Sequence, residues 1–242
     1  MERRQRADAV QGDLPWLFRT RPSRADGTAF SVAGIVVVVA FGFLIAKTHV
    51  MTHLDLQGVK ALNALHTGVL GALGSVVYRL FSPVEAVALT VLIVVIIWVV
   101  SKNVRLAATF AFTVAVTWVS SDVVKLLVHR SRPDATAFPH HLAQRVVDPS
   151  YPSGHMVFVS TLALTLFFLA RGTRSHILVA VAGAVVTVIV GACLIADGVH
   201  YPTDVIASAV WAAAVTPLVL GLSNRHLLPR TYLLPSSVET LV

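Results

Sequence analysis

The chain has 242 residues, of which 56% are hydrophobic and only 13% are charged. This composition, with a mean hydropathy of +0.77, excludes an ordinary soluble domain and is typical of a membrane protein. The net charge of +7 does not indicate a nucleic-acid partner, because the basic residues lie in short segments between apolar runs rather than in one patch. We therefore expect the lipid bilayer to surround this chain.

Six apolar runs are each long enough to cross a bilayer as a helix. They predict membrane-spanning helices at residues 29–47, 82–101, 104–128, 154–171, 176–196 and 203–223. The sequence thus predicts an all-α fold, a polytopic membrane protein whose six transmembrane helices form one compact bundle. This domain would cover residues 29–223, between a basic N-terminal tail at 1–28 and a C-terminal tail at 224–242.

The link between the first two spans, residues 51–79, carries polar and apolar residues at helical spacing. Two interpretations are open: an amphipathic helix that lies in the outer membrane interface, or a packed hairpin that only connects the two spans. In the first interpretation one helix face is polar and another is apolar. The polar residues are Gln57, Lys60, Asn63 and His66, and the apolar residues are Val59, Leu62, Leu65 and Val69.

Three short polar islands interrupt the apolar sequence, at residues 125–133, 152–155 and 200–204. Ionisable groups beside membrane spans are energetically costly and usually mark function. All three islands belong to one side of the six-span topology, and most basic residues belong to the other side. Those basic residues are Arg3, Arg4, Arg6, Arg19, Arg21, Arg24, Lys102, Arg105, Arg171, Arg174, Arg225 and Arg230. Because positive charge marks the cytoplasmic side, both tails should be cytoplasmic and the islands should face outward from the plasma (inner) membrane.

The first island contains Lys125 and Arg132, which are close to two helical turns apart, and then Pro133. Both cations can project from one face where the third span ends, and the proline directs the chain into a loop. A lysine point charge and a bidentate arginine suit the oxygens of a phosphoryl group. The alternative is that both side chains snorkel from a helix end to the membrane surface. Arg130 would contact the same phosphate or simply face lipid headgroups.

The second island places Ser153, Gly154 and His155 where the fourth span begins. Ser153 is a suitable N-cap, and Gly154 lets a ligand approach the backbone N–H groups closely. The N-terminus of a helix also attracts anions. In this first turn His155 can act as a general acid toward a leaving oxygen. The alternative is a histidine that only caps the helix or faces the membrane interface.

The third island holds His200 and Asp204, four residues apart, where the sixth span begins. A carboxylate that accepts a hydrogen bond from one imidazole nitrogen leaves the other nitrogen free to attack as a nucleophile. A chance pair on one helix is the alternative. The chain shows no cluster of acidic ligands suited to magnesium, so we expect no metal and no other cofactor.

In this order the islands resemble the motifs of the type-2 phosphatidic acid phosphatase superfamily, the lipid phosphate phosphatases: K-x6-RP, PSGH and SR-x5-H-x3-D. The resemblance covers roughly residues 80–223, and the first two motifs match fully. It implies that His200 accepts the phosphoryl group, that Asp204 supports it, and that His155 protonates the leaving group. The phosphate ligands that it implies are Lys125, Arg132, Ser153 and Gly154.

The third motif departs from the family pattern, because its Ser-Arg pair falls on Cys193 and Leu194. Losing one phosphate-binding arginine would remove about 3–4 kcal/mol of transition-state stabilisation, roughly a hundredfold to a thousandfold in rate. Arg130 or Arg145 would supply the missing charge from the loop after the third span. Asp197 stands where an uncharged residue is more usual in the family. It would repel phosphate, pair with such an arginine, or bind another part of the substrate.

The resemblance therefore predicts an integral membrane lipid phosphatase that works through a phosphohistidine and needs no metal. Its substrates would be lipids of the bilayer: phosphatidic acid, phosphatidylglycerophosphate, or a polyprenyl phosphate or pyrophosphate. Two alternatives stay open. One is a lipid phosphotransferase on the same scaffold. The other, because of Leu194, is a catalytically weakened membrane protein that binds lipid phosphates.

Overall fold

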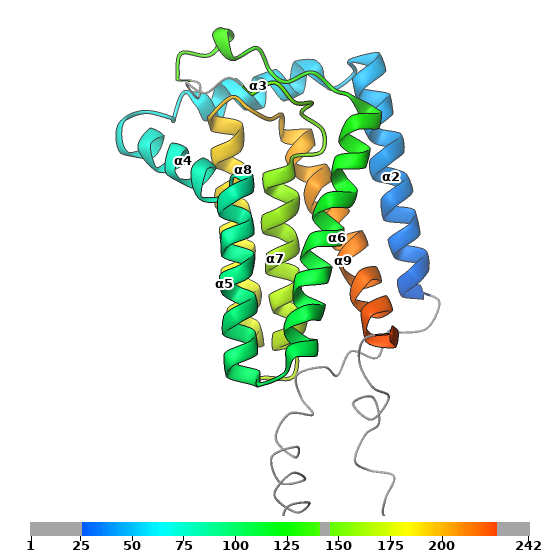
Figure 1. Cartoon of the computed structure of the whole chain (residues 1–242). Coiled ribbons are helices and arrows are strands. Elements are labelled where there is room, and N and C mark those ends of the chain that lie inside the picture. The colour runs from blue at the N-terminus through cyan, green and yellow to red at the C-terminus, as the bar shows by residue number, and fades with distance from the viewer. Residues whose placement is uncertain (1–25, 141–145, 227–242) are drawn as a thin grey trace, which may run out of the picture.

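The computed structural model describes residues 26–140 and 146–226, and in this part of the chain all regular elements are helices. Six helices run side by side as a bundle (Figure 1). They are α2 (Asp26–Thr48), α5 (Pro83–Ser101), α6 (Val104–Val128), α7 (Gly154–Ala170), α8 (His176–Ala196) and α9 (Pro202–His226). The predicted all-α bundle is confirmed, and each of these helices matches a predicted span within a few residues.

The bundle helices differ in how much of their surface faces outward. Five of them are long and apolar enough to cross a membrane, and α7, with 17 residues, is a shorter apolar helix. The chain is thus a multi-pass integral membrane protein. Of the 19 residues of α5, only Ala86 is buried, so this helix offers its apolar side chains to lipid. By contrast, α7 packs against α6, α8 and α9 and forms the centre of the bundle.

Local sequence sets the ends of α6, the helix that delivers the first polar island. The Asn103 side chain caps its start and accepts hydrogen bonds from the backbone N–H groups of residues 105 and 106, as asparagine commonly does at this position. Its end is set by His129, whose φ of 50° lies in the left-handed region. The chain leaves the helix there and turns into the loop that carries both arginines of the first island.

Residues 51–79 form two short helices, α3 (Thr52–Asn63) and α4 (Gly68–Leu80), bent by 118° relative to each other. Both pack on α8 at one end of the bundle (Figure 1). Of the two interpretations that the sequence left open, the single amphipathic helix is wrong and the packed hairpin agrees with the structure. The pattern fails because the polar Asn63 is buried, where it donates a hydrogen bond to the carbonyl of Ala196, whereas the apolar Leu65 is exposed.

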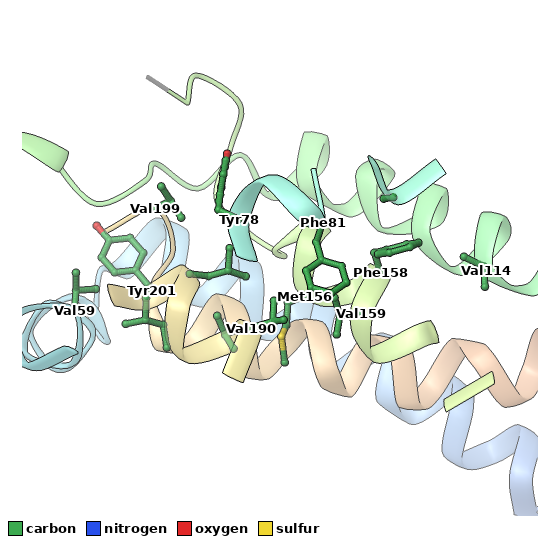
Figure 2. Close-up of a cluster of buried hydrophobic side chains, with 14 of the residues drawn as sticks. Val59, Tyr78, Phe81, Val114, Met156, Phe158, Val159, Val190, Val199 and Tyr201 are labelled. Carbon is green, nitrogen blue, oxygen red and sulfur yellow. The ribbon is translucent and has the colours of Figure 1, made fainter. Parts of the chain in front are cut away.

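An apolar core joins this hairpin to the bundle (Figure 2). In this core the ring of Phe158, from α7, lies 6.4 Å from the ring of Phe81 and 5.2 Å from that of Trp118, measured between centroids. Within a bilayer, close van der Waals packing of such side chains holds the helices together. Other members labelled in Figure 2 are Val59, Tyr78, Val114, Met156, Val159, Val190, Val199 and Tyr201. The core therefore holds α3 and α4 against the end of the bundle where the polar islands lie.

Candidate active site

The structure brings the three polar islands together at the end of the bundle that α3 and α4 cover. The first and third islands meet through Arg132, whose Nη1 donates to the carbonyl of Val199 at 2.6 Å and lies 3.0 Å from Nε2 of His200. The first and second islands meet at Gly154, where a Cβ would lie 3.6 Å from Nζ of Lys125. These contacts place two cations and the start of α7 around one histidine.

The contact with Arg132 determines which nitrogen of His200 carries the proton. A guanidinium has only N–H donors, so Nε2 must accept with its lone pair and the proton must reside on Nδ1. The ring is almost entirely buried, with 1% of its surface exposed. Burial, followed by the positive charges of Arg132 and Lys125, holds the pKa of His200 well below its ordinary value of 6.5. His200 is therefore a neutral imidazole whose Nε2 lone pair is directed at Arg132.

Asp204 lies behind His200, on the Nδ1 side. Its Oδ2 is 3.7 Å from Nδ1 of His200, which is too long for the hydrogen bond that the sequence predicted. Oδ2 instead accepts a hydrogen bond from the backbone N–H of Tyr201 at 3.0 Å. The tautomer of His200 is therefore set by Arg132, while Asp204 supplies a negative charge near the proton.

Ser153 caps the start of α7, as the sequence predicted. The Ser153 side chain accepts a hydrogen bond from the backbone N–H of Met156 at 3.4 Å, and its own N–H donates to Oγ of Ser208 in α9 at 2.8 Å. Gly154 lies next to the amino group of Lys125 and the indole nitrogen of Trp118, and a Cβ there would be 3.6 Å from each. A bare backbone at this point leaves room for an anion between Lys125 and the helix N-terminus.

His155 packs under a residue of the α3–α4 hairpin. The Tyr78 ring of α4 stacks on it with centroids 4.6 Å apart and planes 24° from parallel. Nε2 of His155 is buried and has no hydrogen-bond partner among the residues that the structure describes. A buried ring nitrogen without a partner is unfavourable by itself, so it is suited to meet a ligand atom.

A carboxylate already occupies the space between the two cations of the first island. Asp148 accepts from Nζ of Lys125 at 2.8 Å and from Nη2 of Arg132 at 2.9 Å, and 47% of its side chain is exposed. Partial burial would raise the pKa of Asp148, but Lys125 and Arg132 outweigh burial and hold the pKa at about 2. Asp148 also lines a pocket of about 240 Å³ between residues 129–132 and 146–149. The two cations thus form a site for an anionic oxygen group.

Arg130, in contrast, points into the protein. Its Nη1 donates to Oδ1 of Asp204 and its Nη2 donates to Oδ2 of Asp55, each at 2.6 Å. The guanidinium also lies over the ring of Tyr201, 4.2 Å from its centroid. Because both terminal nitrogens are engaged with carboxylates, Arg130 does not face the anion site beside Lys125.

The residues that stand at or near the missing arginine of the third motif lie in different surroundings. Leu194 is fully buried in the apolar core. Asp197 is buried as well and pairs with His66 of the α3–α4 turn, with 2.7 Å between Oδ1 and Nε2. Burial raises the pKa of Asp197, an effect that the charge of His66 opposes. Arg145 lies outside the described residues. The missing arginine therefore has no replacement at positions 130, 194 or 197.

Sequence patterns gave no indication of Asp55 and Asp148. Asp55 lies within the amphipathic pattern of residues 51–79, and Asp148 lies in a polar loop five residues before Ser153. The only signal for either is a carboxylate near a membrane span, where an isolated charge is costly. Within residues 26–140 and 146–226, no group of three or more histidine, cysteine or acidic side chains could hold a metal ion.

Comparisons with known proteins agree with this arrangement. The sequence model of the PAP2 superfamily matches residues 103–227, a stretch that contains all three polar islands. An undecaprenyl-diphosphatase of Sulfolobus acidocaldarius is 31% identical over 124 residues, which cover 51% of this chain and 57% of that relative. The match thus spans little more than half of the relative's length.

A solved structure shares the fold. The crystal structure of a transmembrane PAP2-type phosphatidylglycerolphosphate phosphatase from Bacillus subtilis superposes with a TM-score of 0.69. The superposition covers 81% of this chain and 96% of the other, at 19% sequence identity. At this identity the likeness concerns the fold alone.

Replacing Asp148 should strengthen anion binding. In Asp148→Asn the two cations lose a carboxylate that any other anion must displace, and hydrogen bonds to charged groups are worth about 1.5–3 kcal/mol. We expect the affinity for inorganic phosphate, measured by calorimetry on the protein in detergent, to rise about tenfold at neutral pH. Asp134→Asn is the matched control, because the Asp134 side chain accepts its hydrogen bonds from Thr136 in the same loop, away from Lys125 and Arg132. Unchanged or weaker phosphate binding in Asp148→Asn would contradict the anion site.

Proposed function

The chain belongs to the PAP2 superfamily, and on this premise we propose that it is an integral membrane phosphatase that acts on lipid phosphates or lipid diphosphates. One observation carries the proposal. The lone pair on Nε2 of buried His200 faces Arg132, 3.0 Å away, and Arg132 and Lys125 together already hold an anionic group. A neutral nucleophile next to an anion site is what phosphoryl transfer requires.

In the first step, Nε2 of His200 attacks the phosphorus atom. The Nε2–P bond forms while the bond between phosphorus and the lipid oxygen breaks. His155, near the start of α7, donates a proton to the leaving oxygen. The imidazole keeps its proton on Nδ1 and becomes positively charged, and the carboxylate of Asp204, with Oδ2 3.7 Å away, stabilises that charge.

In the second step, water replaces the histidine. His155 accepts a proton from the water, whose oxygen bonds to phosphorus as the Nε2–P bond breaks. Inorganic phosphate leaves and His200 returns to its neutral form. The same histidine thus acts first as acid and then as base, which restores the starting protonation of the site.

Positive side chains and backbone N–H groups neutralise the phosphoryl oxygens in both steps. Lys125, Arg132 and the helix start at Ser153 and Gly154 supply this charge, so we propose that no metal is needed. Asp148 must leave both ion pairs before the substrate binds, and nearly half of its side chain is already exposed. With Leu194 in the third motif, the site works with one cation fewer than the family pattern provides.

The substrate is a lipid whose phosphate reaches the end of the bundle while its tail stays in the bilayer. Candidates are phosphatidic acid, phosphatidylglycerophosphate and polyprenyl phosphates or diphosphates, and the names of the two similar proteins point to phosphatidylglycerophosphate and to a polyprenyl diphosphate. The basic segments at the opposite end of the bundle indicate that both tails are cytoplasmic. The site would then face outward from the plasma (inner) membrane.

Replacing the nucleophile should abolish the reaction. We expect His200→Ala to lower phosphate release from a panel of these lipids in detergent by at least roughly a thousandfold, because the variant lacks the proposed phosphoryl acceptor. His176→Ala is the matched control: this histidine begins α8 at the opposite end of the bundle (Figure 1) and should leave the rate unchanged.

Three outcomes of this assay separate the candidate functions. Equal phosphate release by the unaltered protein and His200→Ala would contradict the phosphatase and favour a lipid-phosphate-binding protein. A phosphorylated acceptor lipid or sugar in place of free phosphate would favour the phosphotransferase. Release that depends on His200 supports the proposal.

Restoring the arginine of the third motif at position 194 should not raise the rate of phosphate release. Leu194 is fully buried among apolar side chains, and an unpaired charge there would cost several kcal/mol. We expect Leu194→Arg to lower the Tm by about 10 °C and to leave the rate of phosphate release per folded molecule no higher. Leu194→Met, which keeps the volume, should change neither quantity much. A large gain in rate at an unchanged Tm would show instead that the site lacks a cation at this position.

A further inference from the structure

Arg130 carries its charge into the protein interior, where only 6% of its side chain is exposed. Nη1 donates to Oδ1 of Asp204 and Nη2 donates to Oδ2 of Asp55, both at 2.6 Å, and both carboxylates are buried. One guanidinium therefore holds two carboxylates. We call these three residues, Asp55, Arg130 and Asp204, the charge brace.

The charge brace joins three separate parts of the fold. Asp55 belongs to α3, Arg130 to the loop after α6, and Asp204 to the first turn of α9. Thr203 links them further: its hydroxyl donates to Oδ2 of Asp55 at 2.6 Å and accepts from Nη1 of Arg130 at 2.7 Å, and its N–H donates to Oδ1 of Asp55 at 3.1 Å. With the ring of Tyr201 below the guanidinium, the positions of all three charges are closely defined.

The brace carries one net negative charge, because two carboxylates share one guanidinium. That charge is directed toward His200. Arg130 holds Oδ1 of Asp204, whereas Oδ2 of the same carboxylate lies 3.7 Å from Nδ1 of His200. The proton on Nδ1 therefore faces the carboxylate oxygen that the guanidinium does not bind.

We propose that Asp55 and Arg130 are positioning residues for phosphoryl transfer: through the brace they keep Asp204 ionised, with Oδ2 directed at His200. This inference rests on the proposed role of His200 as nucleophile. When Nε2 bonds to phosphorus, the ring becomes cationic with its proton on Nδ1, and the nearby negative charge stabilises it. Asp55 neutralises the positive charge of Arg130, so that the negative charge of Asp204 remains available to stabilise the cationic ring of His200.

Removing either partner of Asp204 in the brace changes the charge behind His200 in a different way. Without Asp55, the single guanidinium neutralises Asp204, and the cationic ring loses its counter-charge. Without Arg130, two neighbouring buried carboxylates repel each other and one of them takes up a proton. A buried carboxylate without a cation beside it takes up a proton, so Asp204 stays ionised only while position 130 is positive. Arg130→Lys keeps this charge and Arg130→Gln removes it, so comparing the two separates an electrostatic role from a purely structural one.

The experiment compares phosphate release by the full chain in detergent for Asp55→Asn, Arg130→Gln and Arg130→Lys. We expect Asp55→Asn to lower kcat about a hundredfold while KM changes by less than about twofold, because the phosphate ligands Lys125 and Arg132 are intact. Arg130→Lys, which keeps the cation beside Asp204, should have a kcat at least roughly tenfold above that of Arg130→Gln. Equal kcat in the two Arg130 variants would overturn the inference.

Asn63→Ala is the matched control on the same helix. Asn63 ties α3 to α8 through its hydrogen bond to the carbonyl of Ala196 but does not touch the brace. We expect Asn63→Ala to lower the Tm while it keeps the unaltered kcat. A fall in kcat as large as that of Asp55→Asn would overturn the inference, since any loosening of α3 would then have the same effect.

A second measurement does not depend on turnover. Orthovanadate mimics the five-coordinate phosphorus bound to a histidine, and its affinity is measured by calorimetry on the same proteins. We expect Asp55→Asn to bind it about tenfold more weakly than the unaltered protein, and Arg130→Lys to bind it more tightly than Arg130→Gln. Equal vanadate affinity in all of these proteins would overturn the brace even where phosphate release is intact. The predicted pattern of vanadate affinities without phosphate release from any lipid would overturn the proposed function and support the brace.

Discussion

The charge of Arg130 is buried at one end of a membrane bundle, and the rest of the site depends on how that charge is balanced. An unpaired guanidinium there would be unfavourable by several kcal/mol. Asp55 and Asp204 each accept a hydrogen bond from it at 2.6 Å, and the three residues come from α3, the loop after α6 and α9. This one interaction therefore draws together the hairpin, the first polar island and the third polar island.

The pairing of Arg130 explains why two arginines only two residues apart behave differently. Arg130 bonds to Asp55 and Asp204, whereas Arg132 contacts His200 and Asp148. The first arginine holds the carboxylate behind the histidine, and the second faces the lone pair of Nε2. Burial, followed by the charges of Arg132 and Lys125, keeps His200 neutral, which suits a nucleophile that must attack an anionic phosphate.

The bundle and the grouping of the islands could be predicted, because both depend on local signals. Uncharged runs mark the spans, and Ser153 caps α7 as its position before a helix suggests. The contacts of the site could not be predicted, since no period links Arg130 to Asp55, which lies 75 residues earlier. For a similar reason, the sequence could not decide between one helix and a hairpin over residues 51–79. Asn63 and His66 follow a regular spacing but are satisfied by distant partners in and after α8.

The nucleophilic role of His200 is tested most directly by trapping the covalent intermediate. The protein is mixed with a radiolabelled lipid phosphate, quenched within one turnover, and digested to locate the label. We expect a label that is stable to alkali and labile to acid, as a phosphohistidine is, on the peptide that contains His200. The label should be absent from His200→Ala. Phosphate release without any trapped label, or a label on another residue, would contradict the proposed mechanism.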